Sequence, residues 1–307
     1  MEQTKQTIFT NKFIVALAAL FCCALWGSAT PFIKLGYELM LPVRDTASTM
    51  LFAGVRFTLA GILVILIYSL ARKKFLYPKK ENLGRVATVA TFQTVVQYIF
   101  FYIGLANTSG VKGTVASGSS AFFALLIASL IFRQEKLTFK KILACILGFG
   151  GIILINLNGL DFNMNFFGDC FVIFSAIASA ASAVLVKKYS KFEDAVIISG
   201  YQFVMGGIVM IIVGLIFGGI IAVSGIKAIS VLIYLAFLSA AAYSIWGVLL
   251  KHNPVSKVTF YSFTTPVFGV LLSKLMLSEE SLVSPVNLLI TLLLMCAGIM
   301  ILNYKKE

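Results

Sequence analysis

A single arginine, Arg56, interrupts the apolar run from Leu51 to Leu70, and it is the first candidate for chemistry in this sequence. A guanidinium stays charged in proteins, and its planar fork of N–H donors suits bidentate binding of a carboxylate. If the run spans a membrane, Arg56 lies about 13 Å below its outer edge, close to the middle of the hydrocarbon. A cation there costs about 2.5–3.5 kcal/mol on insertion scales, so we expect Arg56 to face a wet cavity or a partner.

The partner of Arg56 has two interpretations. No Asp or Glu lies well inside any apolar run of the chain, so a carboxylate on a substrate is one candidate. The other is structural support, in which the guanidinium binds backbone carbonyls freed near a helix break. The sequence leaves both open.

Amides and aromatic rings in other apolar runs could line the same cavity. Aromatic residues often anchor helices at the membrane surface, but Tyr98 and Tyr243 come about 20 Å after the point where the chain enters their runs, which is too deep for that role. An aromatic cavity with amides and one arginine would suit a small organic carboxylate or an amino acid. Besides Arg56, the candidates of this kind are Trp26, Gln93, Gln97, Tyr98, Gln202, Tyr243 and Trp246.

Two corresponding runs contain helix-breaking residues. The stretch "SGSSAFFALL" (117–126) corresponds to "SFTTPVFGVLL" (262–272), where proline removes a backbone donor. Interrupted helices at matching places mark the sites of many transporters, although small hydroxyl residues also serve plain helix packing. The binding candidates in these stretches are Ser117, Ser120, Thr264, Thr265 and Pro266.

Composition places these residues in a membrane. The chain has 307 residues, of which 60% are hydrophobic and 12% charged, and its mean hydropathy is +0.98. Soluble domains are about a quarter charged, so most of this surface is expected to face lipid. We expect an all-α integral membrane protein with ten transmembrane helices, placed at 13–35, 47–71, 85–106, 112–132, 139–157, 167–189, 194–218, 229–250, 256–277 and 285–303.

The basic residues predict the orientation. Nineteen Lys and Arg fall on the side of the two chain ends and three on the other, so the positive-inside rule puts both termini in the cytoplasm. The net charge of +13 comes from short clusters between apolar runs rather than from one basic face, which argues against a nucleic-acid partner.

The two halves of the chain match each other. Shifted by 146 residues, Gly54, Phe57 and Gly61 fall on Gly200, Phe203 and Gly207, whereas Gln202 replaces Arg56. Shifted by 145 residues, further polar residues coincide: Lys112, Thr114, Ser117, Glu135 and Tyr98 fall on Lys257, Thr259, Ser262, Glu280 and Tyr243. Five spans in each half predict two inverted five-helix repeats, 1–157 and 158–307, because an odd number reverses the second copy. Inverted repeats are typical of transporters with a site near the midplane.

The stretches "ALWGSATPFIK", "GVRFTLAG" and "LGFGGIILI", with Glu135 between the last two, resemble the EamA-type members of the drug/metabolite transporter superfamily. The resemblance covers nearly the whole chain. It implies ten helices, a cavity lined by the first four helices of each repeat, peripheral fifth and tenth helices, and traffic of metabolites, amino acids or drugs, commonly export.

The leading hypothesis is therefore a secondary transporter that moves a small organic metabolite, such as an amino acid or carboxylate, by alternating access, and we expect the direction to be export. The alternatives are a drug or amine efflux carrier of the same fold, an intramembrane enzyme and a channel. The spans contain no HExxH motif, Asp pair or histidine, so we expect no enzyme, metal or cofactor. We expect a bacterial inner membrane, with the lipid bilayer and a small-molecule substrate as partners. Gly214 and Gly218 form a GxxxG pair that would serve packing within the chain or a homodimer.

Overall fold

The computed structural model describes residues 8–157, 165–277 and 285–303, and this part of the chain contains helices and no strand. The elements η3, η4 and η6 are π-helical turns, and η1, η2 and η7 are 3₁₀ turns. In chain order the elements are η1 (Ile8–Thr10), α1 (Lys12–Met40), α2 (Thr46–Ala71), η2 (Lys80–Asn82), α3 (Leu83–Ala90), η3 (Thr91–Val96), α4 (Gln97–Ala106), α5 (Gly110–Gly118), α6 (Ser120–Leu126), η4 (Ile127–Ile131), α7 (Phe139–Ile155), η6 (Phe166–Cys170), α8 (Phe171–Tyr189), α9 (Ala195–Ile216), α10 (Gly225–His252), α11 (Val255–Thr259), η7 (Phe260–Thr264), α12 (Thr265–Leu277) and α13 (Pro285–Asn303).

Among the described residues, eight helical stretches are long and apolar enough to cross a membrane. The expected fifth and tenth spans are not among these eight. Helix α7 has 17 residues, and the apolar stretch of α13, Val286–Leu302, is also shorter than the eight. The chain is therefore an all-α, multi-pass membrane protein, and ten spans stay a prediction.

Capping residues set where several helices begin. Asn11 accepts a hydrogen bond of 2.9 Å from the backbone N–H of Phe13 at the start of α1. Asp45 does the same for Ser48 in α2 at 2.7 Å, and this bond lowers the pKa of the Asp45 carboxyl. These side chains satisfy backbone donors that the first turn of a helix leaves without partners.

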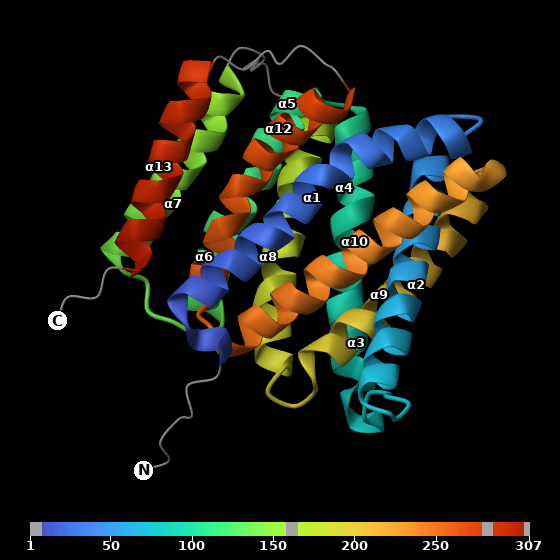
Figure 1. The fold of residues 1–307 in the computed structure, drawn as a ribbon, viewed down its shortest axis with the longest axis horizontal. Helices are drawn as coiled ribbons and strands as arrows, with labels where there is room; N and C mark the ends of the chain where they lie inside the picture. The colour runs from blue at the N-terminus through green and yellow to red at the C-terminus, as the bar shows by residue number, and fades with distance from the viewer. Residues whose placement is uncertain (1–7, 158–164, 278–284, 304–307) are drawn as a thin grey trace.

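Figure 1 shows one bundle in which α1 and α10 run obliquely across more upright helices. With 29 residues, α1 is about 43 Å long, so it must tilt to fit a hydrocarbon core of about 30 Å. Helices α7 and α13 lie side by side at one edge, and α2 pairs with α9 at the other. We call the end of the bundle where α1 begins and α13 ends the proximal end, and the opposite one the distal end.

Glycines allow α2 and α9 to touch along their backbones. A Cβ on Gly61 would lie 2.5 Å from the carbonyl oxygen of Gly200, and one on Gly54 would lie 2.9 Å from that of Gly207. Gly61 therefore faces Gly200, and Gly54 faces Gly207. Small residues permit this close approach, which maximises dispersion contacts where lipid offers no hydrophobic driving force.

Two spans contain helix breaks. Helix α5 ends at Gly118 and α6 begins at Ser120, with Ser119 between them. In the matching span, α11 passes into the 3₁₀ turn η7 before α12 begins with Thr265 and Pro266. The predicted interruption of both spans is confirmed.

Candidate functional site

Arg56 lies in the interior of the bundle. Its side chain is 4% exposed, and its guanidinium carbon stacks 4.3 Å from the centroid of the Phe57 ring. Its charge interacts with the hydroxyls of four tyrosines, Tyr37, Tyr98, Tyr102 and Tyr243. Its Nε has no hydrogen-bond partner among the described residues. The arginine is therefore held by aromatic rings and phenols rather than by a carboxylate of the described chain.

Aromatic rings form a continuous chain through the middle of the bundle. Trp26 of α1 meets Trp246 and Tyr243 of α10 edge to face, at centroid distances of 4.8 and 5.2 Å. The chain continues from Tyr243 through Phe203 and Phe57 to Tyr98, at distances of 4.9, 5.1 and 4.5 Å. We call these six rings, together with Arg56, Gln97 and Gln202, the central cluster.

Residues that match between the two halves meet each other in this cluster. Phe57 and Phe203 stack with an angle of only 4° between their planes. The hydroxyls of Tyr98 and Tyr243 lie 3.2 Å apart, within hydrogen-bond distance. A pair of matching residues can touch in this way only where the two halves come together, so the central cluster lies between them.

Gln202, which occupies the place of Arg56 in the second half, is fully buried. Its Oε1 accepts a hydrogen bond of 2.7 Å from the hydroxyl of Thr94 in η3. Its Nε2 has no partner among the described residues. The first half thus contributes a guanidinium to the cluster, and the second half contributes an amide whose Nε2 donates to none of the described residues.

Buried polar atoms without a partner concentrate on the predicted site residues. Leaving such an atom unsatisfied costs about 1–3 kcal/mol, so each one needs an explanation such as a ligand or water. Most of these atoms are N–H donors or hydroxyls, and a carboxylate accepts from both. Among the described residues in or beside the cluster they are Trp26 Nε1, Arg56 Nε, Gln97 Oε1, Gln202 Nε2 and Ser244 Oγ; Thr265 Oγ1, Ser129 Oγ and Gln134 Oε1 lie elsewhere.

The helix-break residues of the second half form a separate group against α1. The Thr264 hydroxyl donates to the carbonyl of Tyr261 at 2.7 Å, and the Cys23 thiol of α1 donates to the same carbonyl at 3.2 Å. Thr265 and Pro266 follow at the start of α12, while Ser117 and Ser120 are partly buried in α5 and α6. The described contacts join neither this group nor Gln93, buried in η3, directly to the central cluster.

Sequence reasoning missed several residues around Arg56. Phe57 and Phe203 were visible as a match between the halves, so the repeat signal could have identified them. Tyr37 and Tyr102 carried no such signal. The first span was expected to end at 35, whereas α1 continues to Met40 and carries Tyr37 towards the arginine.

A separate hollow opens at the proximal end. Its volume is about 420 Å³, and it lies between the end of α2 and the start of α9, lined by Tyr68, Arg72, Lys74, Leu76, Asp194 and Ile197. Tyr68 is about 18 Å along α2 from Arg56, so this hollow is distinct from the central cluster.

The fold and the central cluster define a polytopic helical membrane protein with an aromatic, incompletely paired polar centre. Two segments of the chain, residues 13–157 and 166–304, each match the model of the EamA-like transporter family. The chain belongs to this family and is a membrane transporter of the drug/metabolite type.

Two relatives that the chain resembles over most of its length are named as transporters without a stated substrate. The "Uncharacterized transporter YvbV" of Bacillus subtilis is 26% identical over 299 residues, which cover 95% of this chain and 92% of that protein. An "Uncharacterized transporter" of Archaeoglobus fulgidus is 24% identical over 87% of this chain and 90% of its own length. A solved chain described as "Crystal structure of protein" has a TM-score of 0.77 over 96% of both chains at 14% identity, a likeness of fold alone.

Proposed function

We propose that this protein is a secondary transporter that exports a small organic carboxylate or amino acid by alternating access. The carrying observation is Arg56, a buried cation without a carboxylate partner among the described residues and with an unsatisfied Nε. A substrate carboxylate would supply both the missing charge and the missing acceptor, and Arg forms such bonds in bidentate geometry.

The surrounding groups support an organic anion with an apolar body. Trp26 Nε1 and Gln202 Nε2 are further buried donors without partners, and the six rings offer flat apolar surfaces. Gln97 Oε1 is an unsatisfied acceptor, which would take an N–H of an amino acid. Amines without a carboxylate are the other ligand class, and the buried guanidinium disfavours them by charge repulsion.

The proposed machinery consists of two inverted five-helix repeats, 1–157 and 158–307, that rock about the central cluster in the cell membrane. The double family match, the paired Phe57 and Phe203 and the paired Tyr98 and Tyr243 support this arrangement. The proximal end is proposed to be cytoplasmic, with both termini there. In Figure 1, α1 begins and α13 ends at the same end of the bundle, which agrees with an even number of spans.

Binding and transport assays test the role of Arg56. Purified protein is screened by thermal shift against a panel of amino acids and organic carboxylates, and the hits are measured for uptake and counterflow in liposomes. We expect Arg56→Ala to weaken binding of the active substrate at least tenfold, because it removes a charge-assisted hydrogen bond. Arg44→Ala, at a side chain 60% exposed, is the matched control and should bind as the parent does.

Unchanged binding by Arg56→Ala would refute the substrate contact. An ion current faster than a rocking carrier can sustain, together with an absence of counterflow, would show that the protein is a channel and not a carrier.

A further inference from the structure

Two buried carboxylates lie at opposite ends of the bundle. The Glu135 side chain, 7% exposed, follows η4 at the proximal end. The Asp169 side chain, 9% exposed, lies in η6 at the distal end. The span Val111–Ile131 separates the two places, since Lys112 at its start contacts Asp169 and Glu135 follows its end. Each carboxylate bonds to the family-matched segment of the chain to which it does not belong.

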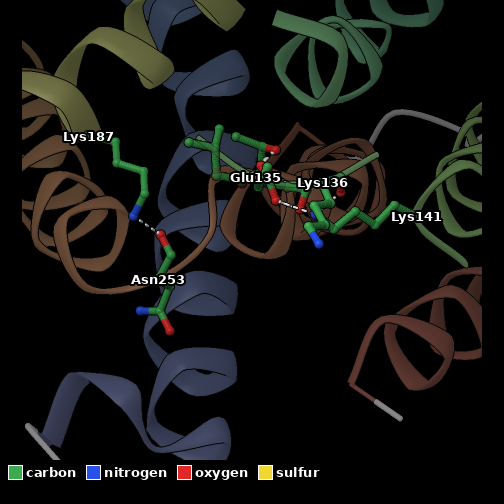
Figure 2. A network of polar contacts seen from close by, with 8 residues as sticks. Glu135, Lys136, Lys141, Lys187 and Asn253 are labelled. Atoms are coloured by element: carbon green, nitrogen blue, oxygen red, sulfur yellow. Dashed lines mark hydrogen bonds and ion pairs between the residues drawn. The ribbon is translucent and has the colours of Figure 1, made fainter. Parts of the chain in front are cut away.

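Glu135 ties the first segment to the start of a broken span in the second. Its Oε1 accepts from the backbone N–H of Ser256 at 2.9 Å, and its Oε2 accepts from the Ser256 hydroxyl at 2.5 Å. Lys141 of α7 donates to the same Oε2 at 2.6 Å, as Figure 2 shows. Ser256 lies in α11, whose first turn supplies the backbone donor. A buried ionised acceptor in such a bond is among the stronger hydrogen bonds of proteins.

Further polar contacts surround this junction. The Gln134 side chain donates to the carbonyl of Val184 at 3.1 Å, which also links the two segments. Lys187 of α8 donates to the carbonyl of Asn253, after the end of α10 (Figure 2). The Asn253 side chain in turn donates to the carbonyl of Phe9 at 2.9 Å. At the proximal end, therefore, Glu135 and Gln134 bond across the two segments, and the Lys187–Asn253 bond holds α8 to the end of α10 within the second segment.

Asp169 makes the corresponding junction at the distal end. It accepts from the Thr108 hydroxyl at 2.5 Å and lies 3.6 Å from the ammonium of Lys112. It also accepts from the backbone N–H of Asn165, directly before η6, at 2.8 Å. The turn between α4 and α5 is thereby held to the start of α8. Both ends are bonded in the same conformation.

We propose that Glu135 is a positioning residue that locks the proximal side of the transporter, with Asp169 as its counterpart on the distal side. The proposal rests on the proposed alternating access, in which one end opens while the other stays closed. Opening the proximal end moves α11 away from the loop after η4, so the Glu135–Ser256 bonds must break. Opening the distal end leaves them intact. The two carboxylates thus set the balance between the two open states.

The native thiols Cys22 and Cys23 report on this opening. Both are 0% exposed, and they bond to the carbonyls of Ala242 and Tyr261 across the face between α1 and the second segment. They lie about 15 Å from the start of α1, in the proximal half. Cys170 in η6 reports on the distal end. Because Cys296 is exposed, it is replaced by Ser in all variants.

The test measures maleimide labelling of each thiol by peptide mass in the full-length, detergent-purified protein. Glutamine has an NH₂ group in place of one of the two acceptor oxygens of Glu135, so it cannot accept both from the Ser256 backbone N–H and from the pair of donors that Oε2 serves, the Ser256 hydroxyl and Lys141. We expect Glu135→Gln to raise the labelling rate of Cys22 and Cys23 roughly tenfold, and to leave Cys170 unchanged. Ser256→Ala, which keeps the backbone bond, should give a smaller increase in the same direction.

Asp169→Asn is the matched control at the distal end, and it should leave the labelling of Cys22 and Cys23 at or below the parent rate. The proposal is overturned if Glu135→Gln labels as the parent does, if Asp169→Asn raises Cys22 and Cys23 equally, or if Glu135→Gln raises Cys170 in the same measure, which would mean general loosening. Labelling needs no substrate, so it tests the lock separately from the proposed function, which substrate binding tests.

Discussion

At the scale of single residues, Arg56 and Gln202 occupy matching places in the two halves and differ in how they are held. Gln202 has a partner for one of its two polar groups, the Thr94 hydroxyl. Arg56 is surrounded by rings and phenols. The binding chemistry of the two halves is therefore unequal, and Arg56 carries the charge.

The Thr94–Gln202 bond makes a prediction about stability. Thr94→Val keeps the shape of the side chain and leaves Gln202 Oε1 buried without a donor, so it should destabilise the protein by about 1–3 kcal/mol. The double variant Thr94→Val/Gln202→Leu removes both partners and should cost less than the sum of the single variants. Thermal unfolding of the purified variants measures this. Additive losses would show that the bond contributes nothing.

The Tyr98–Tyr243 contact predicts that the two tyrosines are interchangeable in their effect. Tyr98→Phe and Tyr243→Phe each remove one hydroxyl of a single shared hydrogen bond. Each should lower the free energy of unfolding by about 1 kcal/mol, and the double variant should lose little more than either single variant. A double variant with the summed loss would mean that each hydroxyl has a separate role.

At the scale of elements, the close crossing of α2 and α9 depends on glycine. A Cβ on Gly61 would lie 2.5 Å from the Gly200 carbonyl and 2.7 Å from Val204. Gly61→Ala should therefore force the helices apart and cost about 1–3 kcal/mol or more. Gly150→Ala in α7 is the control, because no atom lies within 4 Å of its Cβ position. Alanine there should be neutral or slightly stabilising, as thermal unfolding and expression of the folded protein will measure.

Sequence reasoning predicted much at this scale. Pro266 and the Ser- and Gly-rich stretch at 117–120 predicted both helix breaks, because these residues weaken a helix whatever surrounds them. The π-helical turns η3, η4 and η6 were not predictable, since no residue type specifies them. The predicted ends of α1 and α10 were also wrong by several residues, because both helices continue through charged residues, Glu38 in α1 and Lys227 in α10, beyond the membrane thickness assumed for a span.

The candidate site was predictable in part. Arg56, Trp26, Tyr98 and Tyr243 were identified because polar and aromatic residues are conspicuous at such depth. Their mutual contacts were not, because the crossing of α1 over α10 and the tilt of each helix decide which side chains meet. Tyr37 illustrates this, since only the extended α1 brings it to Arg56.

At the scale of the whole molecule, the distribution of basic residues predicts the topology. Reporter fusions at the two ends of the chain should both indicate the cytoplasm, because the proximal loops hold most of the Lys and Arg residues. A cytoplasmic reporter at one terminus and an external reporter at the other would contradict an even number of spans. A reporter inserted after Arg44, in the distal turn between α1 and α2, should indicate the opposite side and serves as the control.

Where matching positions of the two halves touch, the same residue type can occupy both positions only if two such side chains pack against each other favourably. Phenyl rings stack on phenyl rings, as Phe57 does on Phe203. A phenol can donate a hydrogen bond to a second phenol or accept one from it, as between Tyr98 and Tyr243. A cation meets no such condition, since two guanidiniums repel each other. An assembly of two identical five-helix subunits would carry every arginine twice. Joining unlike halves in one polypeptide lets the centre hold Arg56 once, with neutral Gln202 in the twin position.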